Sequence, residues 1–141
     1  MKRIEKENIH TVSMTYLCKD YTGELEILKP EKHSELGWFS LDDLPSPQFE
    51  ASRLAIEMFR LTHLKQSLSK LRSEAVEMNL SAQVVQGKLS GLLYSYQDVS
   101  QNMERIVNRY DNELELVIYT TETNHQLKAT LGVIDEVLGF F

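Results

Sequence analysis

The apolar residues of this chain follow two different periods, and the change of period divides the sequence. Between His10 and Cys18 they alternate with polar residues, so that Val12, Met14 and Tyr16 fall on one face together with Cys18. A period of two is typical of a half-buried strand. The first part of the chain therefore predicts β structure.

Two further apolar runs follow this first predicted strand. Residues 20–23 read Asp-Tyr-Thr-Gly, a turn signal whose glycine can take a positive φ, and residues 25–28 suggest a return strand. The run at residues 36–39 predicts a third short strand. Three short strands bury too little apolar surface to offset their conformational entropy. We therefore expect this region to pack on the second region or on another chain.

From Leu61 onward the apolar residues repeat every seven positions, as in a coiled coil or a helical bundle. Over seven heptads, 15 of the 16 seam positions are apolar, and the phase slips at Glu113. This glutamate either sets the register or marks the end of the seam. The sequence predicts an interaction seam at Leu61, Leu64, Leu68, Leu71, Met78, Val85, Leu89, Leu92, Tyr96, Val99, Met103, Ile106 and Tyr110.

The seam fits two arrangements of the helices. One is a rod of roughly 60 helical residues, about 90 Å long, that buries its seam against another chain. The other is a hairpin or three-helix bundle with bends near residues 79–81 or 87–91, and again at residues 121–124. A repeat of 3.5 residues is common to both arrangements. The pattern therefore leaves the choice open.

Together these patterns predict an α+β fold that is mainly α. Residues 1–46 form a short strand-rich segment, and residues 47–141 form long helices of a coiled coil or three-helix bundle. The junction follows from the prolines, because Pro30, Pro45 and Pro47 all precede residue 48. Ser46 and Pro47 have the character of a helix start.

Composition narrows the class of protein further. The chain has 141 residues, of which 42% are hydrophobic and 26% charged, and its net charge is −6. The acidic balance argues against nucleic-acid binding, and no apolar run is long enough to cross a membrane. The charged start leads into no signal-peptide core, so we expect a cytoplasmic protein. Cys18 is the only cysteine, and the four histidines have no metal-ligand spacing, so we expect no metal and no cofactor.

One segment resembles a known family. Residues 30–45, Pro-Glu-Lys-His-Ser-Glu-Leu-Gly-Trp-Phe-Ser-Leu-Asp-Asp-Leu-Pro, are similar to the C-terminal part of Nudix hydrolases, and the resemblance covers about residues 9–59. In that family the segment forms the last strands of an α/β/α sandwich and the start of its final helix. The resemblance thus implies a Nudix-like fragment followed by a helical region of another kind.

The catalytic element of that family is missing from this chain. Nudix enzymes hydrolyse nucleoside diphosphates linked to another group with a metal-binding box of the form G-x5-E-x7-R-E-U-x-E-E-x-G-U, which should precede residue 10. The run at residues 72–77 has an arginine and two glutamates but lacks the glycines and the paired glutamates. Glu31, Glu35 and Trp38 would then be all that remains of a substrate cleft. We expect no catalytic residue in this chain.

These observations predict a non-catalytic protein–protein interaction module, a regulator or inhibitor built from a degenerate Nudix fragment and an oligomerising helical region. Its expected partner is another protein, above all a second copy in a homodimer. One alternative is a fragment of a magnesium-dependent Nudix pyrophosphohydrolase whose box another chain supplies. A second alternative is a small helical secretion partner or adaptor, in which the resemblance is incidental.

Overall fold

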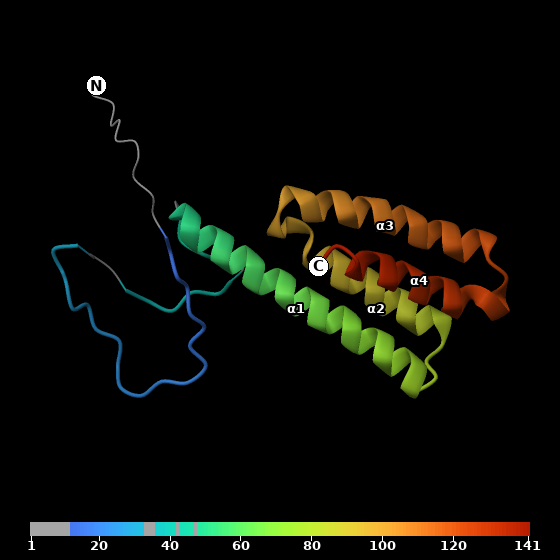
Figure 1. The fold of residues 1–141 in the computed structure, drawn as a ribbon, viewed down its shortest axis with the longest axis horizontal. Coiled ribbons are helices and arrows are strands. Elements are labelled where there is room, and N and C mark those ends of the chain that lie inside the picture. The colour runs from blue at the N-terminus through green and yellow to red at the C-terminus, as the bar shows by residue number, and fades with distance from the viewer. Residues whose placement is uncertain (1–11, 33–35, 42, 47) are drawn as a thin grey trace, which may run out of the picture. The chain divides into compact units, whose positions relative to one another are not determined.

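The computed structural model describes residues 12–32, 36–41, 43–46 and 48–141 (Figure 1). The chain separates into two units, Met1–Ala55 and Ile56–Phe141. The first unit ends within the first helix, so the division lies some residues after the change of hydrophobic period. Each unit is described by itself below.

The described residues before position 50 contain no strand and no helix, so the predicted α+β fold is wrong. The hairpin over residues 10–28 and the strand at residues 36–39 are absent from the described part of these ranges, and His10 lies outside it. Gly23 does take a positive φ, of 87°. The side chains that were expected on the buried face of the strand are open to solvent, with Val12 85% and Tyr16 79% exposed.

The missing sheet follows from the energetics of isolated strands. A strand satisfies its backbone N–H and C=O groups only on a neighbouring strand, and a lone hairpin is marginal in water. Within the described part of the first unit nothing covers the apolar face of residues 12–18, so these side chains stay exposed. The alternating pattern showed which side chains share a face, but it did not show which other segment would cover that face.

The second unit is helical and contains most of α1 together with three further α-helices. In chain order the elements are α1 (Glu50–Glu77), α2 (Ala82–Ser95), the 3₁₀ turn η1 (Gln97–Val99), α3 (Gln101–Thr120), the 3₁₀ turn η2 (Thr123–His125) and α4 (Gln126–Leu138). α1 begins at residue 50, after the predicted start at Ser46 and Pro47, and Pro47 lies outside the described residues. The helices fold back into a bundle (Figure 1), so the single rod is not formed.

Local chemistry explains where the chain bends. Asn79 lies between α1 and α2 with φ 51°, a left-handed conformation that asparagine tolerates better than most residues. The hydroxyl of Ser81 accepts a hydrogen bond from the N–H of Val84 at 3.3 Å, and that of Ser100 accepts one from Met103 at 3.1 Å. These serine caps satisfy N–H groups that the first turns of α2 and α3 leave without a partner. The chain therefore bends near residues 79–81 and 121–124, but the bend at residues 96–100 was not predicted.

A continuous apolar core lies among the four helices. Each helix contributes buried side chains at spacings of three and four residues, as an amphipathic helix requires. The buried apolar residues are Leu64, Leu68, Leu71 and Ala75 of α1, Val85, Leu89 and Leu93 of α2, Met103, Val107, Tyr110 and Leu114 of α3, and Val133, Ile134 and Val137 of α4. The bundle thus buries its helical seam internally.

Two polar contacts tie α4 to its neighbours. The amide of Gln86 donates to the hydroxyl of Thr130 at 3.3 Å inside the core, and that hydroxyl donates to the carbonyl of Gln126 at 2.7 Å. At the surface, Arg72 makes a two-point contact with Asp135, at 2.5 and 3.1 Å. Hydrogen bonding to this carboxylate raises the pKa of Arg72, which keeps the guanidinium charged. Directional contacts of this kind help to set the register of α4.

Candidate functional site

The seam predicted from the heptads lies mostly inside the bundle. Of its thirteen residues, seven are buried: Leu64, Leu68, Leu71, Val85, Leu89, Met103 and Tyr110. Five are partly buried and pack against the core: Leu61, Leu92, Tyr96, Val99 and Ile106. Met78 is 66% exposed at the end of α1. The seam therefore joins helices of one chain to one another.

The core also contains residues that the heptads did not select. In α3 the buried series is Met103, Val107, Tyr110 and Leu114, whereas the strict repeat runs through Ile106 and Glu113. An unsupercoiled helix has 3.6 residues per turn, so its buried stripe drifts away from a repeat of 3.5. This drift leaves Ile106 at the edge of the core, where it lines the site described below.

The residues proposed for a vestigial substrate cleft are not gathered into a buried site. Glu31 is exposed, and Glu35 lies outside the described residues. Trp38 is 70% exposed, and its ring lies 5.3 Å from that of Tyr21. The ring of Trp38 is therefore mostly open to solvent rather than part of an apolar core.

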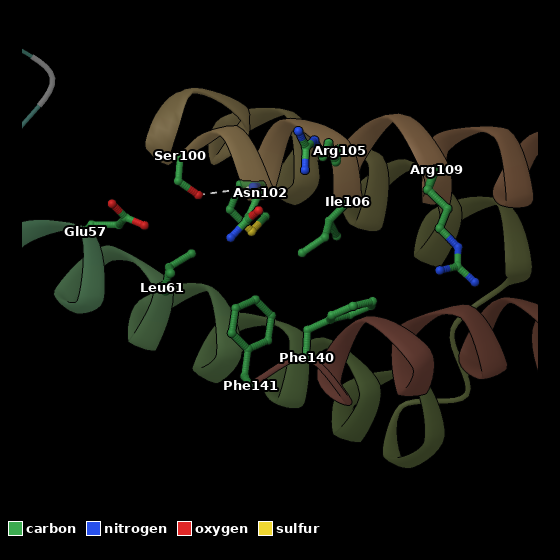
Figure 2. A pocket seen from close by; sticks show the side chains of 10 residues that line it. Glu57, Leu61, Ser100, Asn102, Arg105, Ile106, Arg109, Phe140 and Phe141 are labelled. Atoms are coloured by element: carbon green, nitrogen blue, oxygen red, sulfur yellow. Dashed lines mark hydrogen bonds between the residues drawn. The ribbon is translucent and has the colours of Figure 1, made fainter. Parts of the chain in front are cut away.

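A hollow of the second unit lies between α1 and α3, and we call it the α1–α3 groove. Its volume is about 500 Å³. It is lined by Glu57 and Leu61 of α1, by Ser100, which caps α3, by Asn102, Met103, Arg105, Ile106 and Arg109 of α3, and by the C-terminal Phe140 and Phe141. Figure 2 shows Ile106 reaching across the gap toward the two phenylalanines.

The floor of the groove is apolar and firmly supported. Phe141 packs against the core, as do Leu61 and Ile106 at its edges. Phe140 lies edge-on to the buried ring of Tyr110, with ring centroids 5.9 Å apart, yet it remains 51% exposed. Aromatic and aliphatic side chains held on rigid helices are the usual anchors of a binding surface.

Charged residues stand at the two ends of the groove. Glu57 lies at one end and Arg109 at the other (Figure 2). The guanidinium of Arg109 lies 5.3 Å from the ring centre of Tyr110 and donates to Glu113 at 3.3 Å. Burial raises the pKa of the Tyr110 phenol, so this ring stays neutral under ordinary conditions. The α3 side of the groove is therefore basic.

Glu113 connects this basic side to α4. It is half-buried, and its carboxyl group hydrogen-bonds to that of Glu136. Because two carboxylates in contact cannot both ionise without cost, the hydrogen bond and the charge of Glu113 raise the pKa of Glu136. Glu113 thus lies where the heptad seam ends, with Leu114 taking the buried position beside it.

A second hollow, of about 440 Å³, lies between α1 and α2. Its lining combines small and charged residues, including Ser67, Gly91, Lys70 and Glu74, and the last two form an ion pair at 3.8 Å. It has no aromatic lining residue. The α1–α3 groove, with its aromatic floor, is therefore the stronger candidate for a binding site.

Other kinds of site find no support in the described part of the chain. The ranges 12–32, 36–41, 43–46 and 48–141 contain no group of three His, Cys, Asp or Glu side chains that could hold a metal ion. Over the same ranges, none of the helices combines the length and the apolar character that a membrane crossing needs.

Comparison with known protein families, with curated proteins and with solved structures gave no match. The resemblance of residues 9–59 to Nudix hydrolases therefore stays a hypothesis that depends on the residues quoted for it. The function must be argued from the groove.

Proposed function

We propose that this chain is a non-catalytic protein–protein interaction module that binds a partner in the α1–α3 groove. The observation that carries the proposal is the aromatic floor of the groove, where Phe140 is held edge-on against the buried ring of Tyr110 and is still 51% exposed. Exposed apolar surface rimmed by polar residues commonly marks an interaction site. In this role the chain is a regulator or adaptor rather than an enzyme.

The shape of the groove favours a protein segment over a small molecule. Pockets for small ligands bury most of the ligand surface, whereas the groove is open enough to leave its floor residue Phe140 51% exposed. A groove between two helices is suited to a third helix laid along it. The heptad seam was the main argument for a homodimer, and the bundle already uses that seam internally. A second copy would have to bind another surface.

A selection experiment tests this proposal without knowledge of the partner. Peptides displayed on phage are selected on the immobilised full chain, with Ile106→Glu as the counter-target. A charge on Ile106, which reaches across the groove toward the two phenylalanines, is expected to weaken groove binders about thirty-fold or more, as for an important interface residue. Affinities measured by fluorescence anisotropy give the comparison.

The matched control is Leu116→Glu, which places the same charge on an exposed apolar residue of α3 outside the groove. Circular dichroism must show the same helix content for both variants. Peptides that bind the parent and both variants equally would contradict the groove as the binding surface.

The enzymatic alternative has its own assay. The pure chain is incubated with ADP-ribose or nucleoside triphosphates and magnesium, with and without a chelator. Turnover that chelation abolishes would replace the proposal by a metal-dependent pyrophosphohydrolase.

A further inference from the structure

The rim of the α1–α3 groove is charged asymmetrically. Arg105 and Arg109 line it from α3, one helical turn apart. Arg109 already donates to Glu113, but Arg105 is exposed and has no ion pair within the described part of the chain. The α3 rim therefore presents two guanidinium groups, one of which has its full hydrogen-bonding capacity available.

The α1 rim has the opposite sign. Glu57 lies on it, at the far end of the groove from Arg109 (Figure 2). A carboxylate of a bound partner would be attracted along α3, where the guanidinium groups of Arg105 and Arg109 line the groove. The charges thus make the two long sides of the groove different, whereas the apolar floor alone would not favour one orientation of a bound segment.

Resting on the function proposed above, we propose that the occupant is an amphipathic helix of a partner protein with two acidic residues, one turn apart, beside its apolar stripe. The stripe covers Phe140 and Ile106, and the two acidic residues face Arg105 and Arg109. Arginine is suited to this contact because its guanidinium can donate two parallel hydrogen bonds to one carboxylate. The charge pairs fix the orientation of the helix in the groove.

The net charge of −6 does not oppose this assignment at ordinary salt. Charges more than about 8 Å apart are largely screened at 0.15 M ionic strength, whereas a contacting pair at a partly desolvated rim is screened less. At low salt the net negative charge should slow the association of an acidic partner. Once bound, the partner is still stabilised by its contacts with Arg105 and Arg109. Affinity should fall as salt rises further.

A pair of designed peptides tests the charge assignment on the full chain. The first is a helical peptide of about 18 residues, or about 27 Å, with a leucine stripe and two glutamates one turn apart beside it. The second has glutamine in place of both glutamates. We expect the glutamate peptide to bind about three- to twenty-fold more tightly in fluorescence anisotropy, which corresponds to two exposed ion pairs.

The variants locate the effect. Arg105→Gln together with Arg109→Gln should make the affinities for the two peptides equal, because no rim guanidinium is left to pair with a glutamate. Lys128→Gln removes a cation of α4 that does not line the groove, and the preference should survive it. A preference that persists in the double arginine variant would overturn the inference.

The remaining outcomes separate this inference from the proposed function. If both peptides bind equally and Ile106→Glu abolishes both, the acidic partner is wrong but the groove stands. If neither designed peptide binds but the phage selection still yields groove-dependent binders, only the acidic-helix inference fails. If the phage selection also yields no groove-dependent binder, the proposed function is overturned as well. Mass that doubles with concentration, and no longer does so in Ile106→Glu, would assign the groove to a second copy instead.

Discussion

The two units of this chain each contain a periodic hydrophobic pattern, but the structural outcomes are opposite. In residues 12–46 the period of two leaves most apolar side chains in water, with Leu28 79% and Met14 72% exposed. In Ile56–Phe141 the longer period is converted into a core in which Leu64, Leu89 and Val107 have no exposed surface. A helix satisfies its backbone within its own segment, whereas a strand needs a neighbour. The comparison shows that a pattern yields buried area only where a second layer is present to cover it.

The largest expected effect is on the free energy of unfolding, which should fall much more when a core leucine is replaced by alanine than when the exposed tryptophan is. Leu64→Ala should lower the free energy of unfolding by about 2–5 kcal/mol, because it removes a fully buried side chain and leaves a cavity. Trp38→Ala should change it by less than about 0.5 kcal/mol, because Trp38 is already 70% exposed. Urea denaturation followed by circular dichroism measures both. A large loss for Trp38→Ala would show that residues 12–46 bury it in solution, and would break the comparison.

A smaller effect is expected where the core contains a polar contact. Thr130→Val keeps the volume but leaves the buried amide of Gln86 without its side-chain partner, which should cost about 1–3 kcal/mol. Adding Gln86→Leu removes the unsatisfied group and should restore most of the lost stability. The same urea titration measures the pair as a double-mutant cycle. Additive losses would contradict a coupled contact between α2 and α4.

The smallest effect is electrostatic and depends on pH. The folded protein raises the pKa of Glu136 above its unfolded value, so its protonated form is favoured by folding. The stabilisation is therefore complete below the unfolded pKa and is lost as the pH rises through the folded pKa. Glu136→Gln keeps the hydrogen bond to Glu113 without the second charge, so it should be more stable than the parent at neutral pH and lose this advantage in acid. Thermal melts from acid to neutral pH test this, and parallel profiles for parent and variant would refute it.

The heptad pattern predicted much of the helical unit because helices depend mainly on nearby residues. The buried positions Leu64, Leu68 and Leu71 follow from the seam, and residues 79–81 were one of the candidate bends. The bend at residues 96–100 was missed because the heptad continues through it in phase and no proline marks it. The serine cap at Ser100 was the available signal. The error in the first unit was of another kind, since it assumed that an alternating face would find a cover.

Very little of the candidate site could be predicted. Ile106 was selected as a seam residue, but its place at the edge of the core depends on the drift of α3 against a strict heptad. Phe140 and Phe141 are not among the residues that the heptad seam selected. Their position opposite Ile106 depends on how α4 returns along the bundle, through contacts such as that of Arg72 with Asp135.

The sequence by itself determined that residues from about 50 onward are helical, and it determined most of the residues that those helices bury. Only the tertiary structure decided that the helices fold back rather than extend as a rod, because a repeat near 3.5 residues serves an internal and an intermolecular seam equally well. It also decided that the first unit forms no sheet in its described part, because strand pairing requires partners far apart in sequence. The α1–α3 groove was also decided by the tertiary structure, since Leu61 of α1, Ile106 of α3 and Phe140, which follows α4, become neighbours only when the helices pack together.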